Sequence, residues 1–272
     1  MTTKTSTNPP SSEEVLLSTD GPLAVIRLNR PEKLNAFAGT MRDVLAACLE
    51  WVAEHREVKV LLLTGAGRAF CAGGDVRALS AIRERKDEAA FRGLLEAGRR
   101  IIRLLRCLPQ PSIALVNGVA AGAGFSLAMG CDMRIATEKA RFIAGFGAIG
   151  LHPDWGLSHT LPRVIGPARA LDVLLTARPI SAEEALDIGL VNRIVSSEVL
   201  EHEGRLLATT LAHMAPEALA RTRANVLQAV ERSFEDAFDA EIEAQLACFR
   251  TEDLREGLAA FAEKRPARFQ GT

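Results

Sequence analysis

The chain has 272 residues, of which 48% are hydrophobic and 25% are charged, and its 33 Lys and Arg against 34 Asp and Glu give a formal net charge of −1. These fractions are those of a globular protein and exclude a disordered, collagen-like or coiled-coil chain. The balanced charge argues against a nucleic-acid partner, because a surface that binds nucleic acid needs a basic excess.

The cysteines, the apolar runs and the N-terminal residues indicate a cytoplasmic protein. The five cysteines are widely spaced and odd in number, which predicts reduced thiols rather than disulfides or a zinc site, and we expect no metal. No stretch approaches the roughly 20 apolar residues of a membrane span, so we expect no membrane association. Residues 1–13 are polar, lack the apolar run of a signal peptide and predict a disordered tail.

The first half of the chain alternates strands and helices. Glu14–Ser18 and Leu23–Leu28 predict a hairpin around the turn at residues 19–22. Apolar residues at helical spacing predict a helix over Thr40–His55, with Thr40 as its N-cap. Val58–Thr64 predicts a strand that is buried on both faces.

The same alternation continues, and it predicts an α/β core with largely parallel strands. A long helix, a strand, a Gly/Ala-rich helix and another strand are expected at Asp87–Leu108, Ser112–Val116, Ala120–Met129 and Met133–Ala136.

Beyond Gly156 the pattern becomes helical. Leu190–Val195 is the only strand expected there, and helices are expected at Pro167–Ala177, Ala182–Gly189, Glu198–Met214, Pro216–Ser233 and Glu235–Phe249. We therefore expect an α/β core over residues 14–195 and a helical region over 196–272. The apolar stripes of these helices must be buried on the core or on another subunit, which favours an oligomer.

Two glycine-rich loops, Ala69–Val76 and Asn117–Gly124, each follow a predicted buried strand. Glycine lets backbone N–H groups approach a ligand, and two such loops facing each other would form an oxyanion hole. The alternative is that the glycines serve only tight turns and close packing. Neither loop matches a dinucleotide or nucleotide-phosphate motif.

These segments resemble a known family. Leu28–Ala36, Phe70–Val76, Asn117–Asp132, Ile180–Val191 and Arg255–Arg265 are similar, in this order, to the enoyl-CoA hydratase/isomerase (crotonase) superfamily. The resemblance implies an α/β fold, a spiral of ββα repeats followed by a C-terminal helical region that forms homotrimers, often paired into hexamers. It implies an acyl-CoA substrate and no cofactor, since coenzyme A enters as part of the substrate.

The resemblance also implies site residues. The backbone N–H groups of Gly74 and Ala123 would form the oxyanion hole for the thioester carbonyl. Lys33 and Lys264 would meet the phosphates of coenzyme A, although for either lysine alone an ordinary solvated charge is the favoured interpretation. The full set implied to contact the acyl-CoA is Lys33, Leu34, Ala36, Ala72, Gly73, Asp75, Val76, Val119, Ala121, Gly122, Ser126, Gly145, Phe146, Ile149, Phe261 and Lys264.

The chain departs from the hydratases of the family at two positions. Hydratases carry two glutamates that position water and exchange its proton with the substrate, and the matching residues here are Ser126 and Phe146. Neither side chain can deprotonate water near neutral pH, so the two-glutamate hydration is not expected. Asp154 remains, and its surroundings most resemble an isomerase branch that acts on the ring epoxide of phenylacetyl-CoA.

Asp154 is therefore the predicted catalytic residue. Its apolar sequence neighbours would desolvate the carboxylate and raise its pKa toward the range of a proton shuttle. The alternative is an N-cap for a helix after Pro153. His152 and His159 suggest a weaker His–Asp pair, and Cys71 and Cys131 are expected to be packing residues.

The sequence thus predicts an acyl-CoA isomerase that moves a double bond, or opens a ring, next to the thioester. One alternative is a hydratase, hydrolase or dehalogenase-like enzyme that uses Asp154. The other is a non-catalytic acyl-CoA binder that kept the loops and lost the chemistry.

Overall fold

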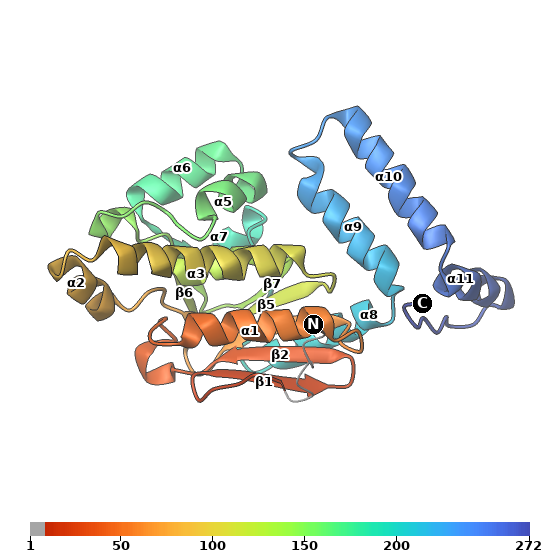
Figure 1. Cartoon of the computed structure of the whole chain (residues 1–272), viewed down its shortest axis with the longest axis horizontal. Helices are drawn as coiled ribbons and strands as arrows, with labels where there is room; N and C mark the ends of the chain where they lie inside the picture. The colour runs from red at the N-terminus through yellow and green to blue at the C-terminus, as the bar shows by residue number, and fades with distance from the viewer. Residues whose placement is uncertain (1–8) are drawn as a thin grey trace.

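The larger of two mixed sheets forms the base of the molecule in the computed structural model, which describes residues 9–272 (Figure 1). β1 and β2 form the predicted antiparallel hairpin, and the remaining neighbours pair in parallel. In sheet order the strands are β1 (Val15–Asp20), β2 (Leu23–Leu28), β3 (Val60–Gly65), β5 (Ser112–Val116), β7 (Met133–Thr137) and β10 (Arg193–Val195).

The second sheet holds the strands that lead to the candidate site. β4, β6 and β8 are parallel and β9 is antiparallel to β8; their bounds are β4 (Ala69–Cys71), β6 (Val119–Ala121), β8 (Arg141–Ile143) and β9 (Pro179–Ser181). Each of the first three follows a strand of the larger sheet and precedes a helix or 3₁₀ turn, which is the expected spiral of ββα repeats.

Two predicted details of this region are wrong. The helix expected from Ala120 begins at Ala123, because residues 119–121 pair with β4 and β8 instead. β9 is a second strand beyond Gly156, where we expected one; its three residues pair with β8 and carry too little sequence for a periodicity to emerge.

Helices cover both faces of the larger sheet. α1 and α3 lie side by side over one face, and α8 packs on the other against apolar side chains of β2, β3 and β5 (Figure 1). The helices of the body are α1 (Met41–Glu54), α2 (Val76–Glu84), α3 (Glu88–Cys107), α4 (Ala123–Gly130), α5 (Leu157–Ile165), α6 (Pro167–Thr176), α7 (Ala182–Asp187) and α8 (Leu200–Ala212), with 3₁₀ turns η1 (Pro31–Lys33) and η2 (Gly147–Ile149). Thr40 precedes α1 as expected, but its side chain makes no capping bond with the described residues.

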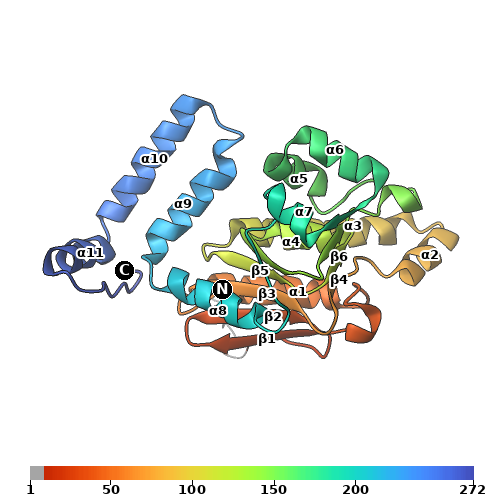
Figure 2. The same cartoon turned by 180° about the vertical axis from the view of Figure 1, so that it is seen from behind.

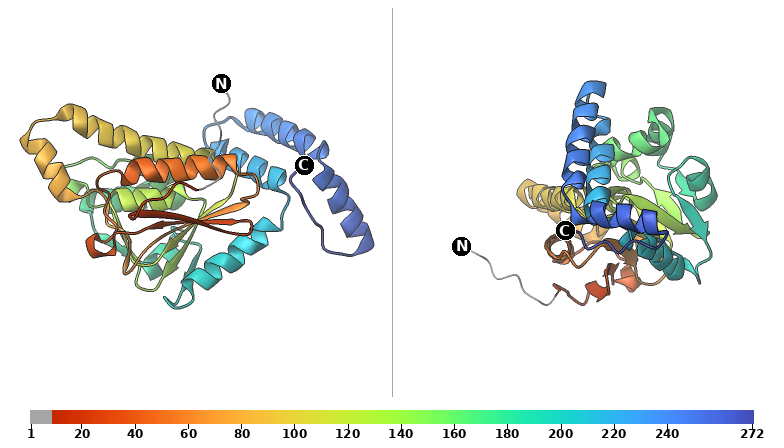
Figure 3. Two further views of the ribbon diagram at one scale, coloured as in Figure 1. Left: turned by 60° about the horizontal axis from the view of Figure 1, so that its bottom comes forward. Right: turned by 90° about the vertical axis from the view of Figure 1, so that its right-hand side faces the viewer.

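The last three helices, α9 (Pro216–Ala229), α10 (Phe234–Phe249) and α11 (Glu252–Glu263), form an arm that projects from the body (Figures 2 and 3). Arg223 of α9 anchors it through a 2.7 Å ion pair with Asp132 and hydrogen bonds to the carbonyls of Leu105, Arg106 and Leu108. α9 and α10 bury none of their residues. Large apolar side chains therefore stay exposed along the arm, among them Val226, Val230, Phe234, Phe238, Ile242, Phe249, Leu258 and Phe261.

Residues 1–8 of the expected tail lie outside the described residues. Closer to the core, the carbonyl of Pro10 accepts the Cys48 thiol at 3.2 Å, and the N–H of Ser12 donates to Val15. Within the described residues, no helix is long and apolar enough to cross a membrane.

Candidate active site

The two glycine-rich loops meet at the ends of the neighbouring strands β4 and β6. Gly73 has a φ of +94°, and a Cβ on this residue would lie 2.8 Å from the carbonyl oxygen of Ala121 and 3.3 Å from the nitrogen of Ala123. Only glycine fits this position without strain, because its φ is positive and the other loop is so close. The segments 69–76 and 117–124 are thereby held against each other.

The N–H groups of Gly74 and Ala123 have no acceptor among residues 9–272. The hydrogen bonds around Gly74 use other atoms, since Phe37 donates to Gly73 at 2.7 Å and Asp75 donates to Phe37 at 3.1 Å. Ala123 is the first residue of α4, where the N–H groups lack an intrahelical partner and the helix dipole is positive. Each loop thus presents a backbone N–H donor that the described residues do not use, which is what an oxyanion site requires.

Residues 34–36 are tied to the first loop. The N–H of Ala72 donates to the carbonyl of Leu34 at 2.9 Å. The fully buried amide of Asn35 donates to the carbonyls of Ala66, Ala69 and Phe70. Asn35 itself has a left-handed φ of 58°. Its side chain therefore fixes the segment that the resemblance assigns to coenzyme A.

One oxygen of the Asp154 carboxylate is left without a partner. Its Oδ1 is buried and has no hydrogen-bond partner among residues 9–272. Burial raises the pKa of this carboxyl to about 6, against the opposing effects of Arg42, of a hydrogen bond from the residue's own backbone and of His152. The N-cap alternative is wrong: Gly156 occupies the N-cap of α5, and Asp154 contributes only its backbone carbonyl, which accepts from Leu157 at 3.1 Å.

Ser126 and Phe146 have structural contacts at this site. The hydroxyl of Ser126, on α4, is 3.0 Å from the backbone carbonyl of Asp154 and 3.2 Å from that of Gly122. The ring of Phe146 is buried and lies 3.9 Å from the position that a Cβ on Gly122 would occupy. Ser126 therefore joins the second loop to the segment of Asp154, and Phe146 forms an apolar wall.

Trp155, the residue next to Asp154, is held in place by packing. It is a non-glycine residue with a φ of 49°, its ring centroid lies 4.8 Å from that of Phe37, and it is 6% exposed. Its indole fills the space next to Gly98 of α3, where a Cβ would lie 1.9 Å from Nε1. The absence of a side chain at Gly98 therefore allows Trp155 to occupy this position.

Arg42 of α1 is a site residue that the sequence reasoning missed. Its guanidinium carbon lies 5.3 Å from the Phe37 ring centroid and 6.0 Å from that of Trp155, within the range of cation–π contacts. It influences both Asp154 and Cys71 electrostatically. One arginine in an amphipathic helix is usually solvated, so only tertiary structure could reveal its burial.

A cavity of about 870 Å³ opens beside the first loop, between α2, the start of α3 and η2. It is connected to the loop by Leu79, which lines it and whose Cδ1 is 3.6 Å from the position of a Cβ on Gly74. Val76 and Ile149, both predicted to contact the acyl-CoA, also line it.

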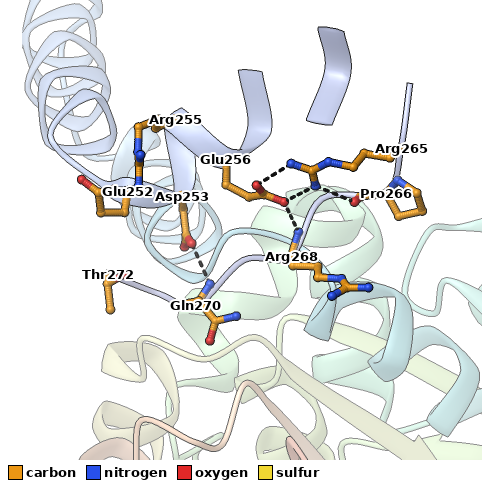
Figure 4. Close-up of a pocket in the computed structure, with 9 residues that line it drawn as sticks. All are labelled: Glu252, Asp253, Arg255, Glu256, Arg265, Pro266, Arg268, Gln270 and Thr272. Carbon is orange, nitrogen blue, oxygen red and sulfur yellow. Dashed lines mark hydrogen bonds and ion pairs between the residues drawn. The ribbon is translucent and has the colours of Figure 1, made fainter. Parts of the chain in front are cut away.

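A second cavity, of about 620 Å³, lies on the arm between α11 and the C-terminal residues (Figure 4). Most of its charged groups are paired: Arg265 forms an ion pair with Glu256, and Asp253 accepts from the N–H groups of Gln270 and Gly271. The guanidinium of Arg268 makes no ion pair within residues 9–272, but it is exposed to solvent, unlike the buried Oδ1 of Asp154.

Comparison with known proteins identifies the family. The sequence pattern of the enoyl-CoA hydratase/isomerase family matches residues 18–272. The chain belongs to this family. It is 37% identical to 1,2-epoxyphenylacetyl-CoA isomerase of Escherichia coli, over 95% of this chain and 99% of the relative. It is 35% identical to crotonyl-CoA hydratase of Syntrophomonas wolfei, over 94% and 98%. The crystal structure of an enoyl-CoA hydratase from Bacillus anthracis matches with a TM-score of 0.91 and 31% identity, over 95% and 100%.

Membership of the enoyl-CoA hydratase/isomerase family confirms the predicted fold and the acyl-CoA substrate class. In a single chain the structure gathers most of the predicted site residues around the two loops and the adjoining cavity. Phe261 and Lys264 are the exceptions, because they lie at the end of α11 on the arm, and Phe261 is 87% exposed.

The secondary candidates have other roles. His159 pairs with Glu231 at 3.4 Å rather than with Asp154, and Asp75 caps α2 through its side chain. Cys71 and Cys131 are buried, and burial raises the pKa of each thiol to about 12, as suits packing residues. No cluster of three metal-ligating side chains is present in residues 9–272.

Proposed function

We propose that the protein is an acyl-CoA isomerase that moves a double bond, or opens a ring, adjacent to the thioester. The observation that carries this proposal is the buried Oδ1 of Asp154, which has no hydrogen-bond partner within the described residues. Ser126 connects the backbone carbonyl of Asp154 to the second loop, where the N–H of Ala123 is free. A carboxyl with a pKa of about 6 can both accept and return a proton near neutral pH.

In the proposed reaction the N–H groups of Gly74 and Ala123 donate to the thioester carbonyl oxygen of a 3-enoyl ester. The carboxylate of Asp154 removes a proton from carbon 2, and the electron pair of that C–H bond forms a dienolate whose negative charge rests on the carbonyl oxygen. Asp154 then returns the proton to carbon 4, and the double bond ends between carbons 2 and 3. Each oxyanion donor is expected to contribute about 3 kcal/mol to the transition state.

The side chains at positions 126 and 146 support isomerisation over hydration. Ser126 is 1% exposed, and its one hydroxyl proton is directed at the carbonyl of Asp154, with that of Gly122 also 3.2 Å away. A serine hydroxyl is not a useful base near neutral pH. Phe146 offers a hydrocarbon ring where hydration needs a second carboxylate. A reaction that needs one base and no water suits this site.

The test is to follow the absorbance of the conjugated thioester with 3-enoyl-CoA and 2-enoyl-CoA esters in parallel. The proposal predicts a rise with the 3-enoyl ester and a steady signal with the 2-enoyl ester. A falling signal with the 2-enoyl ester would establish water addition instead.

A hydratase is the second candidate, and the similarity to crotonyl-CoA hydratase favours it. In that case, or in a hydrolase or dehalogenase-like reaction, Asp154 would act on water or form an ester with the substrate. Labelled oxygen from solvent would then appear in the product, whereas an isomerase incorporates none. A non-catalytic binder would bind CoA esters and turn over no acyl chain.

We further propose that the active protein is a cytoplasmic homotrimer or a hexamer made of two trimers. The exposed apolar side chains of the arm need a covering surface. If the arm of each copy packed against the body of a neighbouring copy, that body would supply the covering surface. The same packing would bring Phe261 and Lys264 toward an acyl-CoA bound to the neighbouring copy.

A further inference from the structure

Arg42 carries a buried positive charge without a fixed partner. The residue is 8% exposed, and its Nε is buried with no hydrogen-bond partner. Within residues 9–272, no acceptor lies within hydrogen-bond distance of its guanidinium, and no carboxylate lies within 4 Å. Burying an unpaired guanidinium is costly, so the fold retains this group against its own stability.

Arg42 does not itself line the 870 Å³ cavity, but it lies beside the loop residue Gly74 that borders it. Its Nη2 is 3.7 Å, and the Cδ1 of Leu79 is 3.6 Å, from the position that a Cβ on Gly74 would occupy. Leu79 lines the 870 Å³ cavity, and Gly74 carries one of the free N–H groups. With a thioester held at Gly74, the far end of a short acyl chain would therefore lie within reach of the guanidinium.

The surroundings hold the guanidinium without using its hydrogen-bond donors. The rings of Phe37 and Trp155 contact it through cation–π geometry, which restricts its plane and leaves its N–H groups free. The charged and titratable groups that influence it are Asp154, Cys71 and Asp43. A preorganised guanidinium of this kind favours a carboxylate, which it can bind through two parallel hydrogen bonds.

We propose that Arg42 is a specificity-determining residue that binds a second carboxylate, at the far end of a short acyl chain, so that the preferred substrates are CoA esters of dicarboxylic acids. This inference rests on the proposed placement of the thioester at Gly74 and Ala123. A bound carboxylate would satisfy the Arg42 donors. Because it would offset the Arg42 charge that lowers the pKa of Asp154, it would also raise that pKa further.

The test compares equilibrium binding of succinyl-CoA and butyryl-CoA by calorimetry. The two acyl chains have the same length and differ by the terminal carboxylate. Both are saturated, so binding is measured without the double-bond shift. The wild type is expected to bind succinyl-CoA about 10- to 100-fold more tightly, as a charged hydrogen bond at a buried site allows.

Arg42→Met should abolish the preference for succinyl-CoA and leave the affinity for butyryl-CoA within about twofold of the wild-type value. Arg83→Met is the control and should keep the preference, because Arg83 lines the cavity but is exposed. Equal binding of both esters by the wild type would overturn the inference, even if Arg42→Met failed to fold. So would a preference that persists in Arg42→Met, or an equal loss of both affinities. The outcome is independent of the isomerase assay, which tests the proposed function separately.

Discussion

The hydroxyl of Ser126 donates a hydrogen bond to the backbone carbonyl of Asp154, 3.0 Å away, and so ties α4 to the loop that carries the candidate base. The same hydroxyl lies 3.2 Å from the carbonyl of Gly122. One side chain thus connects the candidate oxyanion donor and the candidate base, at the position where the hydratases that this chain resembles carry a glutamate.

Ser126→Ala should lower kcat about tenfold and leave KM nearly unchanged. The variant removes one buried hydrogen bond and lets the Asp154 segment shift, while the cavity wall and the loop N–H groups remain. The measurement is steady-state kinetics, with Ser158→Ala, an exposed serine of α5, as the control. A rise in KM at constant kcat would assign Ser126 to substrate binding instead.

Gly98→Ala should destabilise the protein by about 1–3 kcal/mol and reduce turnover, because the new methyl group would displace the Trp155 indole and with it Asp154. Gly93→Ala is the matched control: it lies in the same helix, and a Cβ there meets nothing within 4 Å. Denaturant unfolding and kinetics check both variants. Equal behaviour of the two would contradict the proposed positioning through Trp155.

Asp154→Asn should stabilise the protein at pH 8 and about half as much at pH 5. The folded-state pKa of about 6 lies above the ordinary value of 3.8, so the folded protein holds this proton more tightly and loses stability as pH rises from about 4 through 6. The asparagine variant escapes that loss, which amounts to up to about 3 kcal/mol. Denaturant unfolding of both proteins at the two pH values, at one protein concentration, measures the difference in the free energy of unfolding. The same increment at both would refute the raised pKa.

Replacing Phe234 and Phe238 together by serine should dissociate the assembly without unfolding the chain. Both rings are exposed, at 73% and 49%, and contact each other with centroids 4.9 Å apart. Light scattering should give a multiple of the 29.3 kDa chain mass for the wild type and a smaller mass for the variant. An unchanged mass would place the contact between subunits elsewhere.

Local patterns predicted most of the elements because their apolar residues repeat over one or more turns or along whole strands. β6 was missed because three residues, Val119–Ala121, give no periodicity, and their pairing with β4 and β8 outweighs the helical tendency of alanine. Asp154 was predicted from its apolar neighbours and the family resemblance. Its unused Oδ1 depends on Gly156 taking the N-cap, which no local rule specifies.

The burial of Arg42 could not be predicted because it depends on two aromatic rings from distant segments. Phe37 precedes α1 and Trp155 precedes α5, and only the packing of Trp155 against Gly98 brings them together around the guanidinium. The placement of Phe261 and Lys264 could not be predicted from local sequence either, because it depends on the direction in which the arm leaves the body.

The most direct test of the central claim measures turnover of a 3-enoyl-CoA ester and equilibrium binding of a saturated CoA ester in Asp154→Asn. Losing the proton shuttle should lower kcat by about 10²- to 10⁴-fold, while the affinity for the ester stays at the wild-type value because the Gly74 and Ala123 donors are untouched. Wild-type turnover in this variant would contradict the assignment of Asp154 as the base.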